Sequence, residues 1–238
     1  MLSQLLIVFW FTCFASCIDM GKRVNGNGRV TTENRSVNST NRIKVLGSMD
    51  VILNEGPSGV KVEADENIIP YILTDVHDDW LEIRTENHVN LNSHNGIKVY
   101  VSTPSVNSIK ISGSGNVNGT EKLYTRDKVD FSVSGSGDIT CNINAPEVNA
   151  SISGSGNINL GGETKDVSVH ITGGGDYDGR NLKAENARVN ITGSGDVNLF
   201  ADASLNVKVT GSGSVRYRGN PTISQKIVGS GSVEKMQR

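Results

Sequence analysis

The stretch that decides the fold is Val189-Asn190-Ile191-Thr192-Gly193-Ser194-Gly195-Asp196-Val197-Asn198-Leu199. Its apolar residues and both of its glycines fall on odd positions, and its polar residues fall between them. Strict alternation of this kind is typical of a β-strand that buries one face. The glycines keep the phase of the buried residues. They therefore occupy inward positions, where the missing side chain lets the backbone bend or approach another segment closely.

This motif is the repeating unit of the chain. A Gly-Ser-Gly tripeptide, or Gly-Gly-Gly in one copy, recurs in steps of 18–22 residues, with its first glycine at Gly113, Gly135, Gly154, Gly173, Gly193, Gly211 and Gly229. A degenerate earlier copy spans Leu46 to Val51. One unit cannot bury its apolar side alone. Stacked units can, because equivalent residues then lie about 4.8 Å apart in successive coils.

We therefore predict an all-β fold, a parallel β-helix (a solenoid) of about 18–22-residue coils with Gly-Ser-Gly corners. A set of antiparallel hairpins with the same tripeptides at the turns is the alternative. The near-constant period and the identical corner residues favour the solenoid, because equivalent side chains then form ladders. The chain has 27 glycines and only 5% aromatic residues, so its core must consist mainly of Val and Ile.

Charge and cysteine content narrow the range of functions. The formal net charge is −2 and no large basic field is present, so nucleic acid is not an expected partner. Cys13 and Cys17 belong to the N-terminal segment, which leaves Cys141 alone in the rest of the chain. We therefore expect no intramolecular disulfide and interpret Cys141 as a small buried hydrophobe.

The N-terminus is predicted to be a targeting segment. Residues 5–15 are continuously apolar, and eleven residues fit the central region of a signal peptide better than a membrane span. Phe14-Ala15-Ser16-Cys17 resembles a bacterial lipobox, although Phe14 and the lack of Lys or Arg in residues 1–4 depart from that motif. We favour lipidation of Cys17, which would attach the protein to the membrane through an N-terminal lipid anchor. Ordinary signal-peptidase cleavage nearby is the alternative.

The predicted organisation has three parts. A signal peptide of the lipoprotein type covers residues 1–16, and a polar tether rich in Asn, Gly, Ser and Thr covers residues 17–41. The β-helical domain covers residues 42–238, with an irregular opening part at 42–105 and regular repeats at 106–238. We expect an exported protein at the outer membrane or the cell surface, with the periplasmic face left open.

The outward positions also repeat, and they supply the candidate binding residues. Small hydroxyls and amides in such columns hydrogen-bond to their equivalents in the next coil. The column that follows the corner is the candidate surface-binding ladder for a glycan or a protein ligand: Asn116, Asp138, Asn157, Asp176 and Asp196. Aromatic side chains for stacking on sugars are few, and for each of them packing in the core is the simpler interpretation: Trp80, Tyr71, Tyr124 and Tyr177.

No catalytic, cofactor-binding or metal-binding residue is predicted, and no cofactor. Asp176, Asp178 and Asp196 offer oxygens for calcium, but calcium-binding β-rolls repeat every nine residues and this chain does not. The acidic residues Asp138, Asp176 and Asp196 sit at repeat-equivalent positions, which argues for a structural role because an active site breaks the symmetry of a repeat. The four histidines include no His-x-x-x-His pair of the kind that binds zinc.

The repeated (I/V)-(S/T)-G-S-G-(D/N)-(V/I) motif resembles that of the head GIN domain family, called adhesins and common in Bacteroidetes. The resemblance covers about residues 40–236, including the earlier copy in Val45–Leu53 and the closing Tyr217-Arg218-Gly219-Asn220-Pro221 and Val228–Val233 segments. It implies a right-handed β-helix, an exported location and an adhesive role. It supplies no catalytic residues.

Three functional hypotheses follow. The first is a lipid-anchored, non-catalytic protein of the cell envelope whose solenoid displays a polar, repetitive binding surface. The second is a polysaccharide-processing enzyme with a groove in the irregular first half. The third is a structural module that self-associates through its end coils, since Gln225 is inward in phase and Val228 outward in the last unit. The sequence leaves the oligomeric state open.

Overall fold

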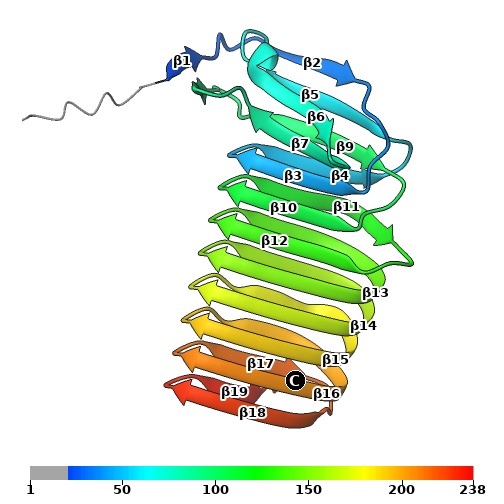
Figure 1. Cartoon of the computed structure of the whole chain (residues 1–238), viewed down its shortest axis with the longest axis vertical. Helices are drawn as coiled ribbons and strands as arrows, with labels where there is room; N and C mark the ends of the chain where they lie inside the picture. Colours follow the sequence, from blue (N-terminus) through cyan, green and yellow to red (C-terminus); the bar gives the residue numbers. More distant parts are fainter. Residues whose placement is uncertain (1–20, 238) are drawn as a thin grey trace, which may run out of the picture.

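Residues 21–237 are described by the computed structural model, and they form one elongated solenoid whose core lies between two long sheets, with a separate two-stranded sheet near its N-terminal end (Figure 1). Each regular coil is a single long strand that bends in its middle, so its two halves lie in different sheets. These strands are β13 (Asp138–Gly154), β14 (Asn157–Gly173), β15 (Tyr177–Gly193) and β16 (Val197–Gly211). Successive coils pair in parallel and the corner glycines are in register. The predicted all-β solenoid is thus confirmed, and the hairpin alternative is wrong.

We call sheet 1 the sheet that the chain enters after a glycine corner, and sheet 2 the sheet that leads into the next corner. Sheet 1 runs through β2 (Val30–Arg35), β5 (Gly59–Asp65), β9 (Lys98–Thr103), β4 (Asp50–Glu55), β11 (Asn116–Tyr124), the first halves of β13 to β16, β17 (Ser214–Arg218) and β19 (Ser232–Lys235). Sheet 2 runs through β6 (Ile72–His77), β7 (Trp80–Thr85), β3 (Arg42–Gly47), β10 (Ser108–Gly113), β12 (Val129–Gly135), the second halves of β13 to β16, and β18 (Thr222–Gly229).

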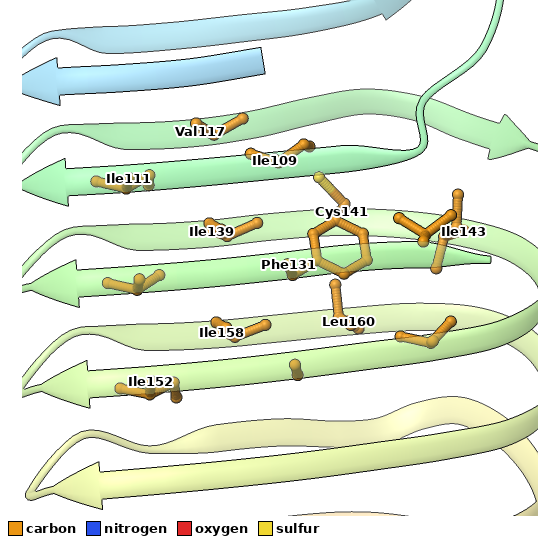
Figure 2. Close-up of a cluster of buried hydrophobic side chains, with 14 of the residues drawn as sticks. Ile109, Ile111, Val117, Phe131, Ile139, Cys141, Ile143, Ile152, Ile158 and Leu160 are labelled. Atoms are coloured by element: carbon orange, nitrogen blue, oxygen red, sulfur yellow. The ribbon is translucent and has the colours of Figure 1, made fainter. Parts of the chain in front are cut away.

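The core is a slab of mostly aliphatic side chains between the two sheets. Figure 2 shows side chains of both sheets, among them Phe131 of β12 and Cys141 of β13, filling the space between them. Within β13 the alternation changes phase at the bend, where Pro146 and Glu147 are both exposed and Val148 starts the new buried series. Two consecutive outward residues let the chain turn into the other sheet while its apolar side chains keep facing the slab.

The glycine corner fixes how one coil sits on the next. The first glycine of each of the seven tripeptides has φ between +122° and +133°, a region that residues with a side chain rarely adopt. A Cβ at the same glycine would overlap the carbonyl oxygen of the equivalent glycine one coil earlier. The middle residue donates its backbone N–H to that oxygen, for example from Ser194 to Gly173 at 2.9 Å. A Cβ at the second glycine would likewise overlap a backbone carbonyl oxygen one coil earlier, so both glycines are required. The second glycine is buried at every corner except the last, where Gly231 is half-buried.

The N-terminal end of the slab is closed by the opening part of the chain. The antiparallel pairs β2–β5 and β6–β7 replace the parallel pattern there. The short helix η1 (Ile69–Tyr71) covers the end of the core with the buried side chain of Ile69. Arg35 of β2 joins the two sheets, because its guanidinium donates to the carbonyl of Ile69 at 3.1 Å and to Thr74 Oγ1 at 3.2 Å.

The structure differs from the predicted polar tether over residues 17–41. Residues 22–25 form β1 (Lys22–Asn25), which pairs with β8 (Val89–Asn92), and residues 30–35 form β2. Strand pairing and polar contacts hold this segment, for example the Asn27 backbone N–H that donates to Asn67 Oδ1 at 2.9 Å, while Val24 and Val37 are only partly buried against the core. The polar composition of residues 17–41 is therefore the reason that strands β1 and β2 were not predicted.

The predicted signal peptide, Cys13 and Cys17 lie outside the described residues. Among residues 21–237, no helix has the length and the apolar character needed to cross a membrane. This part of the chain encloses its own hydrophobic core, so residues 18–238 are expected to fold without the segment that precedes them.

The corner Gly173-Gly174-Gly175 offers a matched test of the glycine requirement. Ala at Gly173 would meet both a φ of +125° and the Gly154 carbonyl, and Ala at Gly175 would overlap the Gly156 carbonyl and lie 2.8 Å from Ile152 Cγ2. We expect Gly173→Ala and Gly175→Ala each to lower the free energy of unfolding by about 3 kcal/mol or more. Gly174 has open space around its Cα, so Gly174→Ala should change it by less than about 1 kcal/mol. Urea unfolding of the three variants measures this, and equal losses at all three positions would contradict it.

Candidate functional site

The candidate binding ladder is a column of hydrogen bonds that runs along sheet 1 beside the corners. Asn116 donates from Nδ2 to Asp50 Oδ1 at 2.8 Å, which adds Asp50 of the earlier copy to the column. From Asn116 onward, the Oδ1 atom of each member accepts the backbone N–H of the following member, and Oδ1 of the last member, Asp196, accepts that of Ser214. The donor–acceptor distances are 2.8–3.2 Å for the five acceptors Asn116, Asp138, Asn157, Asp176 and Asp196. The ladder thus satisfies backbone donors where the chain leaves each corner, and its use by a ligand stays a prediction.

Asp138 tests this structural role. Its Oδ1 accepts both the backbone N–H of Asn157 at 2.9 Å and Asn157 Nδ2 at 2.8 Å. Asp138→Ala leaves both half-buried donors without this acceptor, so we expect the free energy of unfolding to fall by about 1–2 kcal/mol. Asp138→Asn keeps an oxygen at that position and should cost less than about 0.5 kcal/mol. Urea unfolding compares the two variants, and equal losses would show that charge, and not the acceptor, is what matters.

The aspartates considered for calcium are partnered within the protein. Asp178 forms an ion pair with Arg180, whose Nε lies 2.9 and 3.0 Å from the two carboxylate oxygens. This hydrogen bonding to Arg180 holds the pKa of Asp178 below its usual value. Asp196 lies 3.6 Å from Arg216 Nη1. Over the described residues, no three His, Cys, Asp or Glu side chains come together as a metal-binding group.

The four candidate aromatic residues have different environments. Tyr177 is fully buried, so it offers no stacking surface, and burial raises the pKa of its hydroxyl. The ring of Trp80 is half-buried, with Arg42 at 4.2 Å and Lys110 at 4.6 Å from its centroid. Lys22 Nζ lies 2.7 Å from the Tyr71 hydroxyl. Tyr124 is 55% exposed and is the candidate most open to a ligand.

Cys141 is buried in the slab, as the sequence predicted, and is free. Loss of solvation on burial raises the pKa of its thiol to about 12. The reactive thiolate form is therefore scarce at neutral pH, and Cys141 is a packing residue.

A groove runs along the bend side of sheet 2, and sequence reasoning missed it. Its volume is about 530 Å³, and it crosses five coils, from β13 to β18, over roughly 19 Å. Two polar columns line the groove, and in each coil they come from the residues just before and just after the first buried residue that follows the bend. We call them the edge column (Glu147, Asp166, Asn186, Ser204 and Thr222) and the sheet column (Asn149, Ser168, Arg188, Asn206 and Ser224).

Hydrogen bonds order the side chains of the groove. In the edge column, Ser204 Oγ donates to Asn186 Oδ1 at 2.7 Å, and Asn186 Nδ2 donates to Asp166 Oδ1 at 2.9 Å. In the sheet column, Arg188 is exposed and makes no ion pair within residues 21–237. The floor is apolar but narrow, since Leu205 is 1% exposed.

A second hollow of about 550 Å³ continues the same line toward the N-terminal end. Its lining includes Asp130 and Ser108, which pair in register with the sheet column, and it ends at Arg42 beside Trp80. The bend side of sheet 2 is thus hollowed over most of the stack. Repeating amide, hydroxyl and charged groups along such a line suit an extended polar chain that runs parallel to the solenoid axis.

The groove lining contains no pair of carboxyl groups whose different environments would keep one protonated, as a general acid, and the other ionised, as a base or nucleophile. Glu147 and Asp166 are neighbours in the edge column, and glycoside hydrolases use such carboxylate pairs. Those enzymes distinguish the two carboxylates by environment, whereas Glu147 and Asp166 are both exposed. The lining of the groove also holds no His or Cys.

Comparisons with known proteins agree with this architecture. The family described as "Putative auto-transporter adhesin, head GIN domain" matches residues 40–221. A "putative adhesin" from Bacteroides fragilis has a similar structure, with a TM-score of 0.85 at 23% identity over 90% of this chain and 100% of that chain. A "putative adhesin" from Parabacteroides distasonis gives 0.71 at 27% identity, covering 90% and 100% of the two chains.

A further structure from Parabacteroides distasonis is titled "Putative lipid binding protein". Its TM-score is 0.76 at 24% identity, covering 91% of this chain and 100% of that chain. No curated protein matches the sequence significantly.

Proposed function

Because the chain belongs to the head GIN domain family, we propose that it is a non-catalytic binding module of the cell envelope that holds an extended polysaccharide in the groove of sheet 2. The observation that carries this proposal is the in-register repetition of the edge and sheet columns. Their hydrogen-bonding groups recur about every 4.8 Å, a spacing comparable with that of the sugar rings in an extended glycan. The adhesin description of the family supports a surface location and a binding role.

The polarity of the groove favours a glycan over a lipid. Within the groove, the floor residues Val167, Ala187 and Leu205 are at most 4% exposed, and Ile223 at one end, 39% exposed, is the apolar lining residue that is open to an acyl chain. Amides and hydroxyls dominate the two columns, and Arg188 offers a cation that no carboxylate of the described chain neutralises. Such groups bind sugar hydroxyls and any carboxylate on the polymer.

Attachment through Cys17 would place the solenoid close to the membrane. Strand β1 begins at Lys22, so four residues, 18–21, separate it from Cys17. This connection is much shorter than the tether expected from the sequence. The opening part of the solenoid would then face the lipid, and the groove would run away from it.

Binding to immobilised polysaccharides tests the groove. Arg188→Ala removes its unpaired cation, and we expect retention of residues 18–238 to weaken about fivefold, or about 1 kcal/mol. Lys208→Ala is the matched control, because it removes one positive charge from the same sheet outside the groove lining. Equal effects of the two variants would point to general electrostatics and contradict a site in the groove.

The same incubation tests the enzyme alternative by measuring new reducing or unsaturated chain ends. We expect retention without new ends, in the original protein and in a Glu147→Gln/Asp166→Asn variant alike. New ends that disappear in that variant would contradict the non-catalytic proposal. Absence of both retention and new ends would favour a structural module.

Membrane fractionation tests the anchor. In a bacterial host with lipoprotein processing, we expect the original chain in the membrane fraction with the mass of a lipid on Cys17. Cys17→Ser should move it to the soluble exported fraction, while Cys13→Ser, the control inside the predicted signal peptide, should not. Membrane association that survives Cys17→Ser would refute lipidation as the means of attachment.

A further inference from the structure

Two cations on the outer face of sheet 2 share one aromatic ring. Arg42 of β3 and Lys110 of β10 project outward, because their neighbours Ile43 and Ile109 are buried. The guanidinium carbon of Arg42 lies 4.2 Å from the centroid of the Trp80 ring, and Lys110 Nζ lies 4.6 Å from it. The two charges are therefore at most about 9 Å apart, and their contact with the ring holds them in place.

The position of Trp80 follows from a tight hairpin. Trp80 is the first residue of β7, and the two residues that connect β6 to it, Asp78 and Asp79, both have positive φ, as a two-residue hairpin turn requires. Trp80 is half-buried and pairs in register with Arg42 of the neighbouring strand. Its ring therefore lies across β3 and reaches Lys110 on the next strand, β10.

The protein leaves both of these charges without a counter-ion. Within residues 21–237, neither Arg42 nor Lys110 forms an ion pair. Lys44, directly opposite Lys110 in β3, shows the contrast, because it pairs with Glu82 at 2.7 Å. Asp79 lines an adjoining hollow with Arg42 but makes no ion pair with it. Like charges held close together repel one another, so an anion between them is stabilised by both.

The hollow of about 550 Å³ opens beside the two cations. Ser108 pairs in register with Arg42 on one side and with Asp130 on the other, and its small, buried side chain leaves this space. The carboxylates of the lining have partners of their own. Asp130 lies 3.4 Å from Lys128 Nζ, and Asp127 accepts a hydrogen bond from a side-chain amide at 3.3 Å. The hollow thus combines room for a ligand with two cations that no carboxylate of its lining neutralises.

An acidic sugar matches the groups around this hollow. The guanidinium of Arg42 can bind a carboxylate through two parallel hydrogen bonds, and Lys110 supplies a second positive charge. The side-chain amide of Asn41, in the same lining, can bind sugar hydroxyls. Since the hollow continues the line of the groove, the sugars that follow the acidic one would extend along sheet 2 toward Arg188.

We propose that Arg42 and Lys110, held by Trp80, form a subsite for the carboxylate of a uronic acid residue, so that the polysaccharide in the groove is an acidic one. The inference deepens the proposed function and rests on it for the polymer. The subsite itself rests on the two cations and the hollow beside them, so it is tested separately with a short oligosaccharide.

The fluorescence of Trp80 reports binding at the subsite itself. Trp80 is the only tryptophan in residues 18–238, because the other, Trp10, precedes them. We expect a short oligogalacturonate to change the emission saturably, and its affinity to fall several-fold between about 50 and about 500 mM salt. Its methyl ester keeps the sugars but not the charge, so it should bind about tenfold more weakly. Acetate at the same carboxylate concentration should leave the emission unchanged.

A matched pair of lysines locates the site. Lys110→Ala should weaken binding of the oligogalacturonate about fivefold, and the exposed position makes loss of folding unlikely to interfere. Lys208→Ala is the control, because Lys208 is also exposed and lies in the same outward column, five coils further along. It should bind like the original protein. Arg42→Gln, which removes the other cation, should weaken binding at least as much as Lys110→Ala.

The outcomes separate the subsite from the groove. No emission change with oligogalacturonate, equal binding of its methyl ester, an equal response to acetate, or equal effects of Lys110→Ala and Lys208→Ala would each overturn the subsite. Retention of a neutral polysaccharide that Arg188→Ala weakens and Lys110→Ala does not would also overturn it, and would leave the groove proposal intact. Binding of the oligogalacturonate that depends on Lys110, without retention of any polymer that depends on Arg188, would support the subsite and refute the groove.

Discussion

The contact between successive glycine corners is the constraint on which the rest of the structure depends. At each corner a glycine with positive φ accepts, on its carbonyl oxygen, the backbone N–H of the middle residue of the next corner, as from Ser212 to Gly193 at 2.9 Å. No side chain fits between the two backbones. Because each corner can stack only directly above the previous one, the register of every coil is set there and is carried along both sheets.

Exact register has consequences on both surfaces of the sheets. Inside, it places aliphatic residues above one another, so the core is shielded from water although it contains few aromatic side chains. Outside, it converts single polar residues into columns. The column beside the corners is occupied by the protein itself, since Asp138 and its equivalents accept backbone N–H groups. The columns on the bend side of sheet 2 flank a hollow, and Arg188 there makes no ion pair with a carboxylate of the described residues. The same repetition thus gives a structural column and a candidate binding surface.

The sequence predicts the parts of this fold that follow from local alternation. Val189 to Leu199 predicts a strand and its buried face, and the constant period predicts the parallel stack. The same stretch also predicts that both glycines face inward, which holds for Gly195, whereas Gly193 is half-buried because its positive φ turns the backbone at the corner. The bend is harder to foresee, because its only sign is a pair of outward residues such as Pro146 and Glu147, which single-strand periodicity does not distinguish from a loop. The groove depends on that bend, so it was missed with it. Strands β1 and β2 were missed because polar contacts, like that between Asn27 and Asn67, hold them in place.

Residue-resolved amide hydrogen exchange on residues 18–238 tests the central role of the corners most directly. The middle residues Ser155, Gly174 and Ser194 are exposed to solvent, yet each donates its N–H to a carbonyl of the previous corner at 2.9 Å. The account predicts that these amides exchange as slowly as those of the buried strand residues beside them, because they open only when the stack opens. Exchange at the rate of exposed loop amides, with the neighbouring strands still protected, would contradict it.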